Sequence, residues 1–66
     1  MISVVVNDVS RSFAGDCLDV LLGELSLPAK GIAVAVNGEV VRRVDWASHR
    51  LADGDVVDVV TAAQGG

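Results

Sequence analysis

The chain has 66 residues, 52% of them hydrophobic, and a formal net charge of −4 from nine acidic and five basic residues. This hydrophobic content excludes a disordered segment, and the length leaves room for one small core. The excess of acid, with basic residues scattered along the chain, argues against binding to nucleic acid, which requires a basic patch.

The expected cellular location follows from the cysteine count and the apolar runs. Cys17 is the single cysteine, so an internal disulfide is excluded. No apolar run approaches the roughly 20 residues that span a bilayer, and the first residues do not resemble a secretory signal peptide. We therefore expect a cytoplasmic protein that does not associate with membranes.

The first half of the chain predicts a hairpin and one helix. Residues 2–6 and 9–13 are predicted strands, joined at residues 7–8 by an Asn-Asp pair, because both residue types tolerate left-handed backbone. Four leucines then follow at the i, i+3, i+4 and i+7 spacing of an amphipathic helix, at positions 18, 21, 22 and 25. Asp16 is expected to cap the start of this helix, and Pro28 to mark its end.

The second half predicts another hairpin, a crossing segment and a last strand. An Asn-Gly pair at residues 37–38 is the strongest short-range signal for a hairpin, and here it joins a strand at 32–36 to one that begins at residue 40. The segment 44–51 has no strong period and is expected to cross the fold, anchored by its tryptophan and its last leucine. Residues 56–60 are the last predicted strand.

The order of these elements predicts the fold class. A strand that follows a helical crossover pairs in parallel within the same sheet, so the first and last strands are expected to be neighbours. The prediction is an α+β fold: a β-grasp, or ubiquitin-like, roll with a mixed five-stranded sheet and one main helix packed across it. Residues 1–61 would form this domain, and residues 62–66 a flexible C-terminal tail that ends in Gly-Gly.

Reactive side chains within the domain are too few for an enzyme. Cys17 and His49 are far apart in the sequence and lack the further ligands that a zinc site needs. A thiol at a helix start can be somewhat acidified, but neither residue is expected to be catalytic. We expect no catalytic residue, no metal and no stably bound cofactor.

The sheet face that points away from the helix is the candidate contact surface. If Val57 and Val59 point to the core, the period of two in a strand turns their neighbours outward. Small and apolar residues of adjacent strands would join them in a patch around one carboxylate. The predicted contact residues are Val5, Ala33, Ala35, Val56, Asp58 and Val60.

The end of the chain, Gly65 and Gly66, is the most informative feature. Glycine has no Cβ, so a Gly-Gly end can enter a narrow channel of another protein. The Gly66 carboxylate would be the reactive group within a partner's reach, once adenylation by ATP gives it a good leaving group. A sulfur nucleophile would then displace AMP, which makes the domain a handle and its tail the substrate.

The segment from Val34 to Gly66 resembles the sulfur carrier family of thiamin biosynthesis, the ThiS proteins. The matching elements are VNGE, the tryptophan of the crossing segment, LADGD and a last strand that ends in T-x-x-QGG. The first half agrees with the family in layout more than in sequence. It departs from the family pattern with Cys17, where members often have threonine, and with an Asn-Asp first turn in place of Asn-Gly.

The resemblance implies a ubiquitin-like fold and the role of a carrier instead of an enzyme. An adenylating enzyme related to ubiquitin-activating enzymes would use ATP and magnesium to form the acyl-adenylate of Gly66. Sulfur from a donor such as a cysteine desulfurase would convert it to a thiocarboxylate, and thiazole synthase would receive that sulfur for the thiazole ring. Gly66 is the implied modified residue, and Gly65 and Gln64 belong to the tail that enters the partners' active sites.

Three alternatives share parts of this pattern. The small subunit of molybdopterin synthase is a related sulfur carrier with a Gly-Gly end, but its chain is usually longer and lacks the glutamine. A carrier for another sulfur metabolite, or a modifier conjugated to proteins, would share the tail. A TGS-like binding module shares the VNG and DGD elements, but it lies inside larger proteins and needs no free Gly-Gly end.

Overall fold

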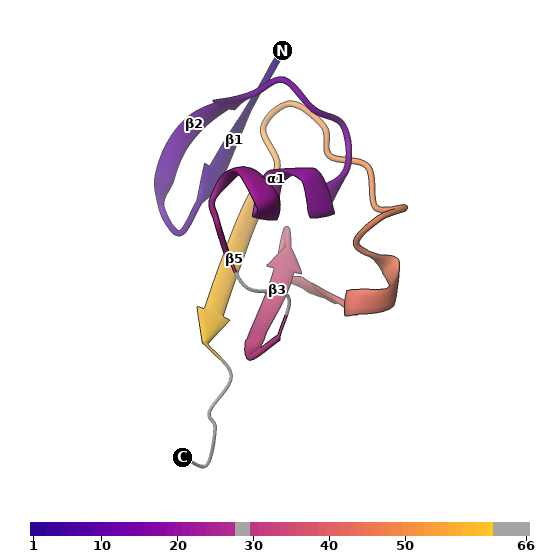
Figure 1. Cartoon of the computed structure of the whole chain (residues 1–66). Coiled ribbons are helices and arrows are strands. Elements are labelled where there is room, and N and C mark those ends of the chain that lie inside the picture. Colours follow the sequence, from indigo (N-terminus) through magenta and orange to yellow (C-terminus); the bar gives the residue numbers. More distant parts are fainter. Residues whose placement is uncertain (28–29, 62–66) are drawn as a thin grey trace.

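The computed structural model of the chain describes residues 1–27 and 30–61, which form a five-stranded sheet with one helix across it (Figure 1). The strands are, in chain order, β1 (Ile2–Val6), β2 (Val9–Phe13), β3 (Ile32–Val36), β4 (Glu39–Val41) and β5 (Val56–Thr61). The helical elements are α1 (Leu18–Glu24) and the short 3-10 helix η1 (Arg43–Asp45).

The sheet has the strand order β2-β1-β5-β3-β4. Both hairpins are antiparallel, whereas β1 and β5 pair in parallel, so the last strand lies between the two hairpins. The predicted β-grasp roll with a mixed sheet is therefore confirmed. The last strand is one residue longer than predicted, because Thr61 still pairs with Ile32 of β3.

Both hairpins turn on two residues with left-handed backbone. The φ angles are 49° at Asn7 and 69° at Asp8 in the first turn, and 54° at Asn37 and 84° at Gly38 in the second. Positive φ at both central residues is the mark of the type I′ turn, whose twist matches that of the two strands it joins. A two-residue turn also fixes the register of each hairpin.

The first-turn asparagine also holds the central strand. The Asn7 side chain accepts a hydrogen bond from the Val59 amide (2.8 Å) and donates one to the Val59 carbonyl (3.1 Å). The parallel ladder itself contains only the pairs of β1 residues Val5 and Val6 with the first two residues of β5. The asparagine side chain therefore extends the pairing of β1 with β5 beyond the end of β1.

The asparagine of the second turn holds the start of β5 from the other flank. Its side chain accepts a hydrogen bond from the Val56 amide (3.0 Å) and donates one to the Asp55 carboxylate (3.1 Å). The Asn37 amide also donates to the Val56 carbonyl (2.7 Å). The central strand is thus fixed by a turn asparagine on each side.

The start of α1 does not match the expected cap. Asp16 lies one residue before the N-cap position, and no side chain caps the helix, so the prediction of an Asp16 cap is wrong. The amides of Leu18 and Asp19 donate instead to backbone carbonyls of the crossing segment, those of His49 (2.9 Å) and Trp46 (3.2 Å). Backbone contacts from distant residues therefore satisfy the first helical amides, which are the groups that a cap would serve.

The helix ends earlier than predicted. Its last residue is Glu24, and Ser26 then turns with a left-handed φ of 59°, while Pro28 lies outside the described residues. The Leu27 amide donates back to the Leu22 carbonyl (3.1 Å), which closes the helix end with backbone groups alone. In the described part of the chain, no helix has the length and apolar content to cross a membrane.

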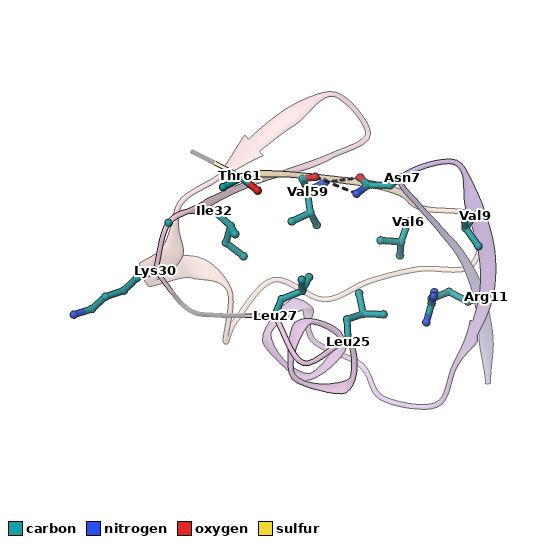
Figure 2. A pocket seen from close by; sticks show the side chains of 11 residues that line it. Val6, Asn7, Val9, Arg11, Leu25, Leu27, Lys30, Ile32, Val59 and Thr61 are labelled. Atoms are coloured by element: carbon teal, nitrogen blue, oxygen red, sulfur yellow. Dashed lines mark hydrogen bonds between the residues drawn. The ribbon is translucent and has the colours of Figure 1, made fainter. Parts of the chain in front are cut away.

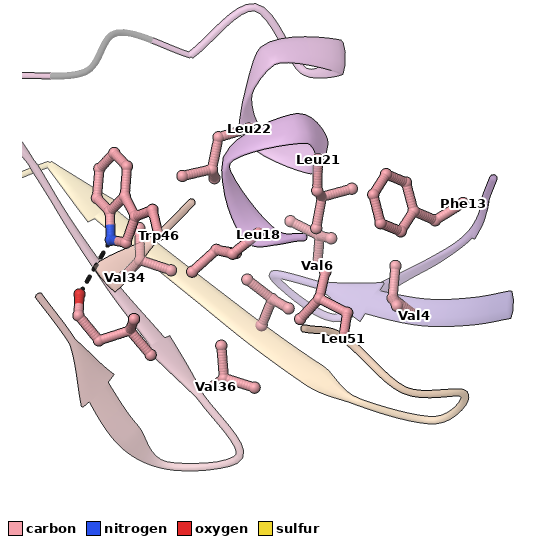
Figure 3. Close-up of a cluster of buried hydrophobic side chains, with 12 residues drawn as sticks. Val4, Val6, Phe13, Leu18, Leu21, Leu22, Val34, Val36, Trp46 and Leu51 are labelled. Atoms are coloured by element: carbon pink, nitrogen blue, oxygen red, sulfur yellow. Dashed lines mark hydrogen bonds between the residues drawn. The ribbon is translucent and has the colours of Figure 1, made fainter. Parts of the chain in front are cut away.

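The core lies between α1 and the inner face of the sheet (Figure 3). Its most deeply buried large side chains are Phe13, Leu18, Leu21, Val4, Val34 and Val57. Trp46 and Leu51 are buried too, so both predicted anchors of the crossing segment are confirmed. The Trp46 indole donates a hydrogen bond to the Val41 carbonyl (3.0 Å), which ties the crossing segment to the end of β4.

We expect Asn7→Gly to lower the free energy of unfolding by about 1–3 kcal/mol, at about 0.5–1.5 kcal/mol for each hydrogen bond to Val59. Glycine keeps the left-handed turn, so the substitution isolates the side-chain contacts. Asp8→Gly is the matched control, because Asp8 shares the left-handed backbone and its side chain makes no hydrogen bond within the described residues. Urea unfolding followed by circular dichroism measures the free energy of unfolding of both variants. Equal losses of stability would contradict a stabilising role of the Asn7 side chain.

We expect Gly23→Ala to raise the free energy of unfolding by about 0.5–1 kcal/mol, because alanine is the better helix former. A Cβ at Gly23 meets no atom within 4 Å. Gly15→Ala is the contrasting variant, since its Cβ would lie 2.7 Å from the Phe13 ring and 2.9 Å from the Val20 side chain. We expect Gly15→Ala to lower the free energy of unfolding by about 1–3 kcal/mol. The same unfolding experiment measures the direction of the change in both variants.

Candidate functional site: the open sheet face and the end of β5

The residues predicted for partner contact lie together on the sheet face that points away from α1. Strand register places Val5 opposite Val56, Ala33 opposite Val60, and Ala35 opposite Asp58. Directly opposed residues share a face of the sheet, so the three strands bring these side chains into one surface. Their contact with a partner stays a prediction.

Val40 belongs to the same surface, although it is missing from the predicted set. It lies opposite Ala35 in the second hairpin. The signal was present in the sequence, because a two-residue turn at Asn37 and Gly38 places these two positions in register. We call this surface the open face; its residues are Val5, Ala33, Ala35, Val40, Val56, Asp58 and Val60.

The open face is apolar and accessible. Val40 is 72% exposed, Val60 59% and Val56 38%, while Asp58 places one exposed carboxylate among them. Single exposed valines are ordinary, whereas large contiguous apolar patches mark interaction sites, and this face brings its apolar side chains together on adjacent strands. This arrangement can bind a protein by burying apolar area; it offers no group for acid, base or nucleophilic chemistry beyond the one carboxylate.

The described structure ends at Thr61, the last residue of β5. The predicted tail, residues 62–66, lies outside the described residues, and with it the predicted site residues Gln64, Gly65 and Gly66. The division into a domain of residues 1–61 and a tail therefore stays a prediction. What the structure does establish is that the tail follows directly on the central strand.

Cys17 lies at the N-cap position of α1, and its side chain is half-buried. Burial raises the pKa of the Cys17 thiol, and the neighbouring Asp16 carboxylate raises it further. The acidification that a helix start can cause does not prevail here, because desolvation and a nearby negative charge both disfavour the thiolate.

Metal ligands do not gather in the described part of the chain. Among residues 1–27 and 30–61, no three His, Cys, Asp or Glu side chains lie close enough together to hold a metal ion. No buried side-chain nitrogen or oxygen in that part lacks a hydrogen-bond partner.

Comparison with known proteins identifies related sequences and structures. The ThiS family model matches residues 4–66. A sulfur carrier protein ThiS from Thermus thermophilus is 38% identical over 63 residues, which cover 96% of this chain and 98% of that protein. A thiazole synthase from Paramagnetospirillum magneticum is 33% identical over 64 residues, which cover 96% of this chain but only 20% of that protein.

The solved structures agree with the sequence comparisons. The crystal structure of the thiamine biosynthesis protein ThiS from Geobacter metallireducens superimposes with a TM-score of 0.85 at 28% identity. The superposition covers 98% of this chain and all of that one (100%), so the two share the same β-grasp fold. The chain therefore belongs to the ThiS family.

Proposed function

We propose that the carboxylate of Gly66 is the group on which this protein carries sulfur. The observation that supports the proposal most directly is the extent of the family match, which runs to residue 66 and so includes the Gly-Gly end. As a member of the ThiS family, the chain is a sulfur carrier of thiamin biosynthesis and not itself a catalyst. Family membership favours this role over a molybdopterin synthase subunit, a protein modifier or a TGS-like module.

The chemistry of the proposed cycle has two steps. A carboxylate is a poor electrophile, so an adenylating enzyme with ATP and magnesium first bonds a Gly66 oxygen to the α-phosphorus, and pyrophosphate leaves. A sulfur nucleophile then attacks the carbonyl carbon, and AMP leaves with the bridging oxygen; sulfide gives the thiocarboxylate directly, whereas the persulfide of a donor such as a cysteine desulfurase gives an acyl disulfide, whose S–S bond a thiol must reduce to release it. Two easy steps thus replace one difficult exchange, and the tail ends in a thiocarboxylate.

The thiocarboxylate is then delivered to thiazole synthase. Its sulfur is anionic and polarizable, which suits a nucleophile that must attack within another protein's active site. The similarity of this chain to a part of the Paramagnetospirillum magneticum thiazole synthase supports that partner. We place the exchange in the cytoplasm, where reducing conditions keep thiols such as the unpaired Cys17 reduced.

The open face is the proposed contact surface for the adenylating enzyme. Three of its residues, Val56, Asp58 and Val60, belong to β5, the strand that leads directly to the tail. An enzyme that draws the tail into its active site must rest against the domain close to that point. An accessible apolar surface beside it supplies the area that such a contact would bury.

We expect deletion of Gly66 to abolish thiocarboxylate formation and to leave the fold intact, because the core is built from residues upstream of the tail. The assay is intact mass after incubation with ATP, magnesium, the adenylating enzyme and sulfide. The wild-type chain should gain the mass of one oxygen replaced by sulfur, located on Gly66 by fragmentation.

Circular dichroism of the deletion variant is the control for folding. Loss of the folded spectrum would mean that the tail is part of the domain. An unchanged mass of the wild-type chain, with an enzyme shown to be active on another carrier, would refute Gly66 as the site of sulfur attachment.

We expect Val60→Asp to weaken binding to the adenylating enzyme about tenfold or more, because it places a second carboxylate in the middle of an apolar contact. Val44→Asp is the matched control: Val44 is 74% exposed and lies in η1, away from the open face. Isothermal titration calorimetry gives both dissociation constants. Equal affinities of the two variants would show that the open face is not part of the interface.

A further inference from the structure

A groove of about 640 Å³ opens between the sheet and the end of α1, on the side of the sheet opposite to the open face (Figure 2). The sheet contributes Val6, Ile32 and Val59 to its wall, and the segment after the helix contributes Leu25 and Leu27. In Figure 2 these aliphatic side chains point toward one another across the groove. The groove is therefore an apolar slot at one end of the roll.

The charge of the groove is opposite to that of the whole chain. Arg11 and Lys30 line it and no acidic residue does, although the sequence has nine acidic and five basic residues. Figure 2 places the two cations at opposite sides of the slot, with the aliphatic side chains between them. Among the described residues the ion pair of the chain joins Arg50 to Asp16, so no described carboxylate neutralises either groove cation.

The groove adjoins the point at which the tail begins. Val59 and Thr61 of β5 line it, whereas Val60 between them belongs to the open face. The last residues of the central strand thus point alternately to the two surfaces. A protein that receives the tail can rest against either side of this strand end.

We propose that the groove docks a segment of thiazole synthase that presents a large apolar side chain between two carboxylates. The apolar side chain fills the slot, and the carboxylates pair with Arg11 and Lys30 at its two sides. The inference rests on the proposed function, because the synthase must receive the tail. The two partner enzymes would then use opposite faces of the same sheet.

Thiazole synthase is the partner of choice for two reasons. In the Paramagnetospirillum magneticum protein, a region similar to this chain is part of the synthase polypeptide itself. The open face is already proposed as the contact surface for the adenylating enzyme, and the groove lies on the other side of β5. Charge complementarity specifies the docked segment: it must bring negative charge to a slot whose described lining holds two cations and no carboxylate.

The test measures binding of the host's thiazole synthase to the full-length chain by isothermal titration calorimetry. We expect the double variant Arg11→Glu/Lys30→Glu to raise the dissociation constant about tenfold or more. Added salt should weaken wild-type binding and have less effect on the variant, because salt screens the pairs that only the wild type makes. The matched control, Arg42→Glu/Arg43→Glu, makes the same change in net charge at exposed residues outside the groove.

A single substitution in the wall keeps the test valid if the double variant does not fold. Val9 lines the groove and is 55% exposed, so Val9→Glu adds a carboxylate there with little cost to the core. We expect it to weaken synthase binding as well, and circular dichroism confirms the fold of each variant.

Three outcomes would overturn the proposal. If the folded groove variants bind the synthase as tightly as the wild type does, the groove is not part of the interface. If the control variant weakens synthase binding as much as the groove variant does, the loss comes from the change in net charge and not from the groove. If the groove variants instead change self-association of the carrier in sedimentation experiments, with synthase affinity unchanged, a second copy occupies the groove. The intact-mass assay on the wild-type chain tests the proposed function separately from all of these.

Discussion

The architecture depends on one constraint: the strand at the centre of the sheet is the last to appear in the sequence. β5 pairs in parallel with β1 and antiparallel with β3, so it alone joins the two hairpins. An isolated two-stranded hairpin is only marginally stable in water. Each hairpin therefore needs β5 beside it to form a stable sheet. The hydrogen bonds of Asn7 to Val59, 52 positions apart, show how far the chain must reach to close this arrangement.

The same strand contributes residues to the core, to the open face and to the groove. Val57 is fully buried in the core, Val56 and Val60 lie on the open face, and Val59 and Thr61 line the groove. This distribution follows from the alternation of side chains in a strand and requires no special geometry. Because β5 is held on both flanks, the point where the tail begins is fixed relative to both candidate surfaces.

Local signals predicted most of the fold. The Asn-Asp and Asn-Gly pairs specify type I′ turns, the leucine spacing specifies the buried side of the helix, and the parallel pairing follows from the helical crossover between the hairpins. With the registers fixed by those turns, the open face could be assembled almost completely before the structure was known. The same registers also place Val40 on the open face, opposite Ala35.

The wrong prediction of the helix cap concerns contacts between distant parts of the chain. Asp16 looks like a helix cap, but backbone carbonyls of the crossing segment take the amides it would have served. The groove depends on how far the end of α1 stands from the sheet, and no local pattern encodes that distance.

The position of β5 also has a consequence for the synthesis of the protein on the ribosome. A nascent chain that stops before residue 56 contains both hairpins and the helix but cannot join them, because the strand that lies between the hairpins is missing. Such a fragment exposes two unpaired strand edges and is open to proteases and aggregation. Folding therefore acts as a length check on the domain: a chain that stops before β5 cannot join its two hairpins, so folded carriers are largely free of molecules truncated within the domain.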